Sequence, residues 1–173
     1  DLQRLLVHEL GVHVTRAENG SKQPLGIFSR GLPGYLDTEE GLAVYSEEKA
    51  GVINTATMRK YAGRVIAAAI ALSHSFSDVF QSIVSDLGPE IAFEVATRAK
   101  RGFRDTSQLG AHTKDIVYLK GYQNVSQHLK ENPEDHKVLF AGKIGLDDIA
   151  LVKNLLDEGI FSWPTSLPHT LSD

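Results

Sequence analysis

Apolar and polar positions recur with the spacing of a helix in nearly every patterned segment of the chain. The first such segment covers residues 2–17, where leucine and valine are dense enough to predict a buried helix that Asp1 could cap. Asn19-Gly20 then indicates a turn, and residues 20–37 contain enough Gly and Pro to predict a loop, with a short extended piece at residues 25–28. By the same criteria and by capping residues, further helices are predicted at residues 37–49, 55–73, 75–87, 89–100, 112–130, 134–141 and 147–157.

This pattern predicts a mainly α fold, because almost every periodic segment has helical spacing. We expect one domain over residues 1–173, since no repeat, low-complexity run or linker divides the chain, and an irregular tail from Trp163 onward. A chain of 173 residues is long enough to bury a sizeable core. The sequence has no initiator Met and opens directly on the first predicted helix, so we expect a piece of a longer protein that lacks upstream residues.

The composition bears on three questions: nucleic-acid binding, membrane insertion and the compartment of the protein. The formal net charge is −4 and no strongly basic stripe occurs, which argues against a nucleic-acid partner. The longest apolar run, residues 65–72, is too short to cross a bilayer, so we expect no membrane span. The absence of cysteine excludes disulfides and thiolate ligands, and it fits a reducing compartment; we therefore expect a cytoplasmic protein.

Candidate chemistry lies in the first predicted helix, where His8, Glu9 and His13 form the pattern H-E-x-x-x-H. The zinc-protease helix has its histidines at i and i+4, and here one extra residue intervenes. At about 100° per residue, an i, i+5 pair lies about 140° apart on a regular helix, too far to share one ion. A π-type turn would bring the two rings together, and Gly11 offers little resistance to it. The pattern therefore predicts a metal site that requires a local distortion.

A catalytic zinc ion needs a third protein ligand and one open position. Glu40, in the second predicted helix, is our choice, although spacing alone does not separate it from Glu39, Glu47 or Glu48. A structural interpretation also exists, because Asp37 followed by Glu40 resembles a capping box. For the histidines the metal interpretation is favoured, since burying the adjacent Glu9 without a partner is costly.

The two motifs together resemble a known family. His8-Glu9-Leu10-Gly11-Val12-His13 followed by Thr38-Glu39-Glu40-Gly41-Leu42-Ala43 is similar to the QEGLA-motif family, which includes the microtubule-associated tyrosine carboxypeptidases and the bacterial flavohaemoglobin expression-modulating QEGLA-motif proteins. The similarity extends to Arg16, residues 19–20, 34–35 and 113–115, and residues 118–119. The resemblance implies zinc held by His8, His13 and Glu40, with Glu9 as the base. Glu39 departs from the pattern, because it stands where the family name has Gln.

Further site residues are candidates only. Tyr118, with Tyr35 behind it, is a candidate to steady the oxyanion of the transition state. A carboxypeptidase also needs a cation for the free carboxylate of its substrate. The available cations are Arg16, Arg30, Arg101, Arg104 and Lys114, of which Arg16, Arg104 and Lys114 are our candidates. Arg16 could instead hold an acid beside the metal ligands. The remaining histidines show no ligand spacing and are predicted to be structural: His74, His112, His128, His136 and His169.

These observations predict a helical zinc-metallopeptidase-like domain with an H-E-x-x-x-H helix. Its expected activity is zinc-dependent peptide hydrolysis, and the carboxypeptidase type, with a peptide or protein C-terminus as substrate, rests on the resemblance. One alternative is a catalytically silent module that keeps the zinc fold, and another is a helical domain without metal. The sequence indicates neither the preferred terminal residue nor the oligomeric state.

Overall fold

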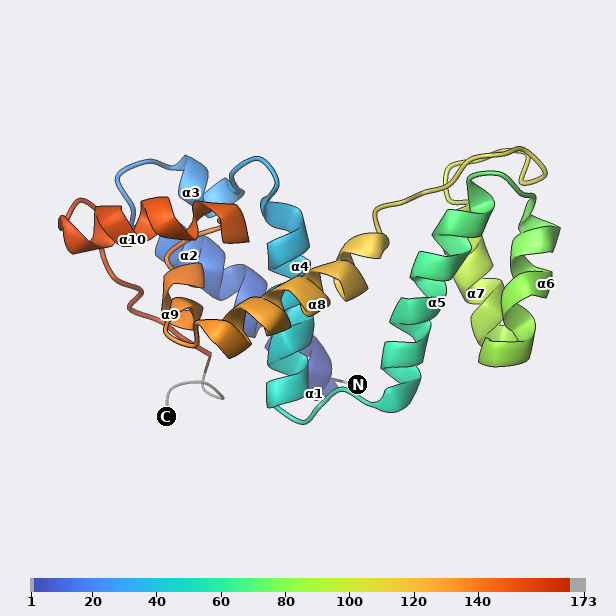
Figure 1. The fold of residues 1–173 in the computed structure, drawn as a ribbon, viewed down its shortest axis with the longest axis horizontal. Coiled ribbons are helices and arrows are strands. Elements are labelled where there is room, and N and C mark those ends of the chain that lie inside the picture. The colour runs from blue at the N-terminus through green and yellow to red at the C-terminus, as the bar shows by residue number, and fades with distance from the viewer. Residues whose placement is uncertain (1, 169–173) are drawn as a thin grey trace. The chain divides into compact units, whose positions relative to one another are not determined.

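The computed structural model describes residues 2–168, which contain helices and no β-strand, so the prediction of a mainly α fold is confirmed. The chain forms two compact units (Figure 1). One comprises Asp1–Ile53 with Lys120–Asp173, and the other comprises Asn54–Leu119. Asp1 and His169, for which a cap and a structural role are predicted, lie outside the described residues. Within residues 2–168, no helix combines the length and apolar character that crossing a membrane requires.

The first unit begins with one continuous helical stretch made of three segments. These are α1 (Leu2–Leu5), the π helix η1 (Leu6–Val14) and α2 (Thr15–Ser21). The other elements that belong to this unit are α3 (Ile27–Arg30), α4 (Tyr35–Lys49), α9 (Asp135–Leu139), the 3₁₀ turn η2 (Leu146–Asp148) and α10 (Ile149–Asp157). The division between the units falls within α8 (Ile116–Glu131).

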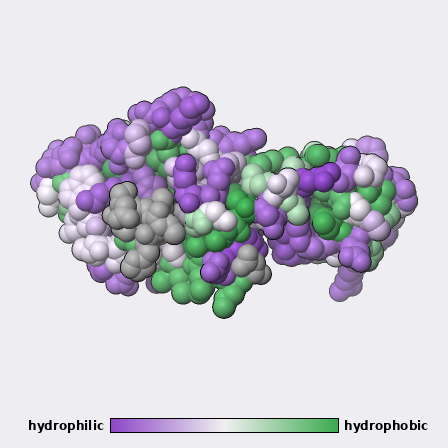
Figure 2. Space-filling view, turned by 90° about the horizontal axis from the view of Figure 1, so that it is seen from below, coloured by the Kyte–Doolittle hydropathy of each residue, from purple (hydrophilic) through white to green (hydrophobic). Residues whose placement is uncertain are grey.

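The first helix does not bury its leucines, so the prediction of a helix buried through its apolar residues is wrong in this respect. His8, Val12 and Arg16 are buried, and they recur at every fourth position. Two positions away from them, Leu6, Leu10 and Val14 therefore lie on the outer face and are exposed, as are Leu2 and Leu5 at the start of the helix. Figure 2 shows that the molecular face seen from below carries apolar as well as hydrophilic areas.

Two local predictions between the first helix and α4 are also wrong. Residues 25–28 are not extended, because helix α3 begins at Ile27 and buries Phe28. Asp37 does not cap the next helix, since α4 begins at Tyr35 and Gly34 is its N-cap. Gly34 has φ +82°, a left-handed conformation that glycine adopts without penalty and that lets the helix begin earlier than the acidic residues suggest.

The core of the first unit joins residues that are far apart in the sequence. Val12 of η1 and Leu42 of α4 pack with side chains from α8 to α10 and from the segment that follows α9. The fully buried members with less than 2% exposure are Val12, Leu42, Ala43, Val125, Val138, Leu139, Phe140, Ala141, Ile144 and Val152. This core fixes the first helix against α4, the two elements that carry the predicted metal ligands.

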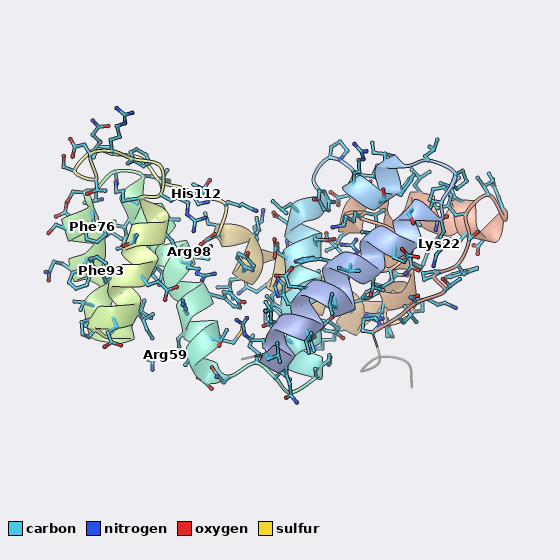
Figure 3. The ribbon with its side chains drawn as sticks, turned by 180° about the vertical axis from the view of Figure 1, so that it is seen from behind. Lys22, Arg59, Phe76, Phe93, Arg98 and His112 are labelled. Atoms are coloured by element: carbon cyan, nitrogen blue, oxygen red, sulfur yellow. The ribbon has the colours of Figure 1, made fainter. Side chains whose placement is uncertain are left out.

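The second unit is built on α5 (Thr55–Ala71), α6 (Phe76–Leu87) and α7 (Pro89–Ala99). Ser75 caps α6 and forms a capping box with Asp78. Alanines of α5 and α7 pack against Val79 and Ile83 of α6, so the helices approach closely. Phe76 and Phe93 meet edge to face with their ring centroids 5.6 Å apart, on neighbouring helices (Figure 3).

A buried lysine fastens the segment that follows α7. The Lys100 ammonium donates hydrogen bonds to the carbonyl oxygens of Ala71, His74, Gln108 and Gly110, at 2.6–3.1 Å. Its side chain is almost fully buried, and this desolvation lowers the pKa of Lys100. Residues 101–110 are thereby held against the end of α5 without regular secondary structure.

Candidate metal centre

A π helix brings the two histidines of the first motif together, as their i, i+5 spacing predicts. The rings of His8 and His13 lie 4.8 Å apart between centroids, at 83° to each other. Gly11 is not needed for steric reasons, because a Cβ there would meet only Leu6 and Pro168 at 3.8 and 3.9 Å, which are ordinary contacts. The distortion therefore comes from nine residues that share the π repeat rather than from one flexible position.

Glu40 of α4 faces both rings. Its Oε2 atom lies 3.3 Å from His8 Nε2 and 3.6 Å from His13 Nε2. Among the described residues, these three are a group whose ligand atoms all lie within 4.8 Å of one another, which suits a shared ion. Two imidazole nitrogens and one carboxylate oxygen are the protein donors of a common catalytic zinc site. The donor set of this cluster therefore fits zinc.

The other acids of α4 occupy different places. Glu47 accepts a hydrogen bond from His8 Nδ1 at 2.7 Å, and Glu39 accepts one from His13 Nδ1 at 3.0 Å. Glu48 is exposed and accepts from the Tyr122 hydroxyl at 2.8 Å. The geometry thus separates four acids that the sequence leaves open: Glu40 faces both Nε2 atoms, Glu39 and Glu47 lie behind the rings, and Glu48 faces away from them.

Cations hold the two acids behind the rings. Arg4 Nη1 lies 3.1 Å from Glu47 Oε1. Glu39 is paired with Arg16 and with Lys143, whose Nζ lies 2.7 Å from Glu39 Oε1. Each histidine ring is therefore the end of a chain that runs from a cation through a carboxylate to the ring.

Arg16 is fully buried and fully engaged within the first unit. Besides Glu39, it donates hydrogen bonds to the carbonyl oxygens of Leu139, Gly142 and Ile144. Its side chain has no exposed surface to offer to a substrate carboxylate. The structure thus has the alternative arrangement, in which Arg16 holds an acid next to a predicted metal ligand.

Proximity of these groups shifts their proton affinities. Burial alone would lower the pKa of His8, but the hydrogen bonds and charges of Glu40 and Glu47 outweigh it and raise that pKa to about 9. For His13 the same opposition, with Glu39 and Glu40, also ends in a raised pKa. Burial would raise the pKa of Glu40, yet its bonds to the two histidines lower it to about 2. Without a metal ion, the cluster thus pairs an ionised Glu40 with two histidines whose pKa values are both raised.

Glu9 and His13 line an open groove of about 450 Å³. The side chain of Glu9 is exposed there, and Lys143 closes the groove on another side. The other lining residues are Val14, Ala17, Glu18 and Ser21. Lys143 carries no sequence signal of its own, because only the fold brings it to Glu39 and to this groove.

The remaining predicted site residues lie in two regions. Tyr35 is half-buried at the start of α4, with Lys143 Nζ 5.9 Å from its ring centroid. Tyr118 lies in the second unit and stacks on Tyr61 with ring centroids 5.3 Å apart. Arg104 and Lys114 are exposed residues of the second unit. Their roles in substrate binding and catalysis stay predictions.

Comparison with known proteins connects this geometry to a family. A family model described as "Microtubule-associated tyrosine carboxypeptidase" matches residues 1–173. The chain is 33% identical over 184 residues to microtubule-associated tyrosine carboxypeptidase 1 of Mus musculus, with 99% of this chain and 36% of the relative covered. The proteins of the same name from Rattus norvegicus and Homo sapiens are each 31% identical, again over 99% of this chain and 36% of their own length.

The chain therefore spans about a third of the length of these relatives. The match extends through both units, from the histidine pair to the C-terminal segment that holds Arg16. The match over the whole chain confirms the part of the predicted resemblance that concerns the tyrosine carboxypeptidases. The chain belongs to the microtubule-associated tyrosine carboxypeptidase family.

Proposed function

We propose that this protein is a zinc-dependent carboxypeptidase that removes the last residue of a peptide or protein chain. The observation that carries the proposal is the convergence of His8 Nε2 and His13 Nε2 on the same oxygen of Glu40, at 3.3 and 3.6 Å. Both Nδ1 atoms already donate to other carboxylates, so each neutral ring keeps its Nε2 lone pair for a metal ion. The names of the relatives support the carboxypeptidase type.

In this proposal His8, His13 and Glu40 hold the metal ion. A zinc ion in such a site supplies Lewis acidity, which lowers the pKa of a water molecule and polarises the scissile carbonyl. Glu9 takes a proton from the attacking water and delivers it to the leaving amine. Its exposed carboxylate lines the same groove as His13, which gives both groups access to one substrate.

The proposed substrate is a chain that ends in tyrosine. The relatives are named tyrosine carboxypeptidases, and the same name describes them as microtubule-associated. For this chain we therefore propose the C-terminus of a protein as the substrate class. The open groove beside His13 suits an extended chain end, because it is not enclosed on all sides.

Zinc content and cleavage of matched peptides test the proposal. The purified chain should contain close to one zinc per molecule and should release tyrosine from a peptide that ends in free tyrosine. The same peptide with an amidated end should stay intact, since a carboxypeptidase requires the free carboxylate. Glu9→Gln should keep the zinc and lose at least about a hundredfold in rate, the low end of the contribution of a general base. Glu158→Gln, at an exposed acid that does not line the groove, is the matched control and should retain activity.

Different failures have different meanings. A chain that binds zinc but cleaves no member of a peptide library with varied C-termini would support the alternative of a silent zinc-fold module. A folded chain without zinc would contradict the metal site itself. Cleavage that persists at the original rate in Glu9→Gln would remove Glu9 from the mechanism.

A further inference from the structure

We infer that Glu39 and Glu47 are positioning residues, each of which fixes one metal-binding histidine by its Nδ1 atom. This inference rests on the proposed function, because it assigns a role toward the same zinc ion. A histidine ligand whose Nδ1–H donates to a carboxylate has its tautomer and its ring orientation set, and it becomes a more basic ligand. The structure places one such carboxylate behind each of the two rings.

The geometry is matched on the two sides of the cluster. His8 donates from Nδ1 to Glu47 and turns Nε2 toward Glu40, while His13 donates from Nδ1 to Glu39 and also turns Nε2 toward Glu40. Glu39 and Glu47 are 2% and 0% exposed, so water does not compete for these hydrogen bonds. A ring held at Nδ1 by a buried carboxylate cannot rotate about χ2 without breaking that bond.

The two carboxylates differ in how much of their charge is neutralised. Glu39 is paired with two cations, Arg16 and Lys143, in addition to His13. Glu47 is paired with one cation, Arg4, in addition to His8. The buried Oε2 atom of Glu47 has no hydrogen-bond partner among the described residues. More of the negative charge of Glu47 therefore acts on its histidine. We expect Glu47 to contribute more than Glu39 to zinc affinity.

Glu39 in turn should contribute more to folding. Its removal would leave Arg16, a fully buried guanidinium, without a counter-charge. Breaking one member of a buried ion pair is strongly destabilising, because the remaining charge stays in a poorly solvated place. Arg4 is partly exposed, so the loss of Glu47 leaves its charge accessible to water. We therefore expect Glu47 to matter more for zinc affinity and Glu39 to matter more for the free energy of unfolding.

The test uses Glu39→Gln and Glu47→Gln, with Glu48→Gln as the matched control on the same helix. Glutamine keeps an acceptor oxygen for the ring N–H but removes the charge. Zinc affinity is measured by competition with a chelator of known affinity, and unfolding of the zinc-free chain by urea. Both substitutions should weaken zinc binding about 10- to 100-fold, the range observed for groups that orient metal ligands. Glu47→Gln should show the larger loss of affinity, Glu39→Gln the larger loss of stability, and Glu48→Gln should stay within about twofold of the original affinity.

A second pair of variants covers the case in which a glutamine variant does not fold. Arg4→Met and Lys143→Met leave the carboxylates in place but remove a cation that holds each one, and neither cation is fully buried. With its cation gone, each carboxylate exerts more of its negative charge on the histidine, so each variant should tighten zinc binding several-fold in a folded chain. Zinc binding as tight as in the unsubstituted chain, in folded variants of both kinds, would overturn the inference. An unsubstituted chain that binds no zinc would instead overturn the proposed function.

Discussion

The backbones of Gly41 and Gly121 touch without any side chain between them. A Cβ atom built on Gly41 would lie 2.1 Å from the carbonyl carbon of Gly121, and one built on Gly121 would lie 1.9 Å from the carbonyl oxygen of Asp37. Gly41 directly follows Glu40 in α4, so this contact determines how closely the helix with the predicted metal ligand approaches α8.

Gly41→Ala should therefore destabilise the protein and disturb the metal centre. The opposing atoms are backbone, which cannot move aside as a side chain does, so the free energy of unfolding should fall by at least ~2 kcal/mol. Urea unfolding and zinc affinity measure the two effects. Gly26→Ala is the control, because a Cβ there would meet nothing within 4 Å and its φ is −60°. Unchanged stability in Gly41→Ala would mean that the two helices are free to separate.

Lys100→Met should destabilise the second unit. Methionine retains much of the apolar stem but leaves four carbonyl oxygens without the ammonium that they share. Hydrogen bonds to a charged donor contribute about 1.5–3 kcal/mol each, so a loss of at least ~2 kcal/mol in the free energy of unfolding is expected. Limited proteolysis should then cut within residues 101–110. Lys114→Met, at an exposed position, is the control and should behave like the original chain.

His136 should make the stability depend on pH. Burial lowers its pKa from 6.5 to about 4, and its Nε2 is buried without a hydrogen-bond partner among residues 2–168. The unfolded chain binds a proton at this residue near pH 6.5, whereas the folded chain does not until about pH 4. The free energy of unfolding should therefore be highest above pH 6.5 as far as His136 is concerned, and it should decline as the pH falls toward 4.

His136→Phe isolates this effect, because phenylalanine suits a ring that packs between Tyr45 and Phe140. Urea unfolding of the zinc-free chain at pH 7 and pH 5 should show a smaller difference for the variant than for the original. An equal difference in both proteins would assign the pH dependence to other groups.

Zinc binding should release protons from the histidine pair. The raised pKa of His8, about 9, means that its ring carries an extra proton at pH 7, and the pKa of His13 is raised in the same direction by Glu39 and Glu40. Zinc requires neutral rings, so between about one and two protons should leave at pH 7, and affinity should rise with pH up to about 9. Calorimetry in two buffers with different ionisation enthalpies counts these protons. Release of none would contradict the assignment of the histidines as ligands.

In the metal-free protein, the histidine pair should make the fold less stable as the pH rises, whereas zinc affinity increases with pH. A histidine with a raised pKa stabilises the fold fully below pH 6.5, and this contribution is lost as the pH rises through about 9. Glu40, with its pKa lowered to about 2, contributes above pH 4.5 and loses that contribution toward pH 2. The metal-free cluster therefore stabilises most between about pH 4.5 and 6.5.

Much of this structure could be predicted because its signals are local. The π turn follows from the number of residues between two histidines, and the Ser75 cap follows from a side chain that bonds three residues away. Most helix bounds agree within a few residues, since Gly51, Gly88 and Pro133 follow the ends of α4, α6 and α8.

The rest depends on contacts between distant residues. Residues 2–17 contain many leucines, yet the face that is buried carries His8, Val12 and Arg16, because their partners come from elsewhere in the chain. Glu39, Glu40, Glu47 and Glu48 have similar local surroundings in the sequence, and only the packing of α4 on η1 gives them different roles. The division into two units likewise has no marker in composition.

The partners of Arg16 have a consequence for synthesis on the ribosome. Its guanidinium binds carbonyl oxygens of residues 123, 126 and 128 positions later in the sequence. The histidine helix leaves the exit tunnel before the groups that surround Arg16, and through it hold Glu39, because those groups come much later in the chain. A nascent chain that stops before Leu139 thus has both histidines but lacks the three carbonyl oxygens that bind Arg16.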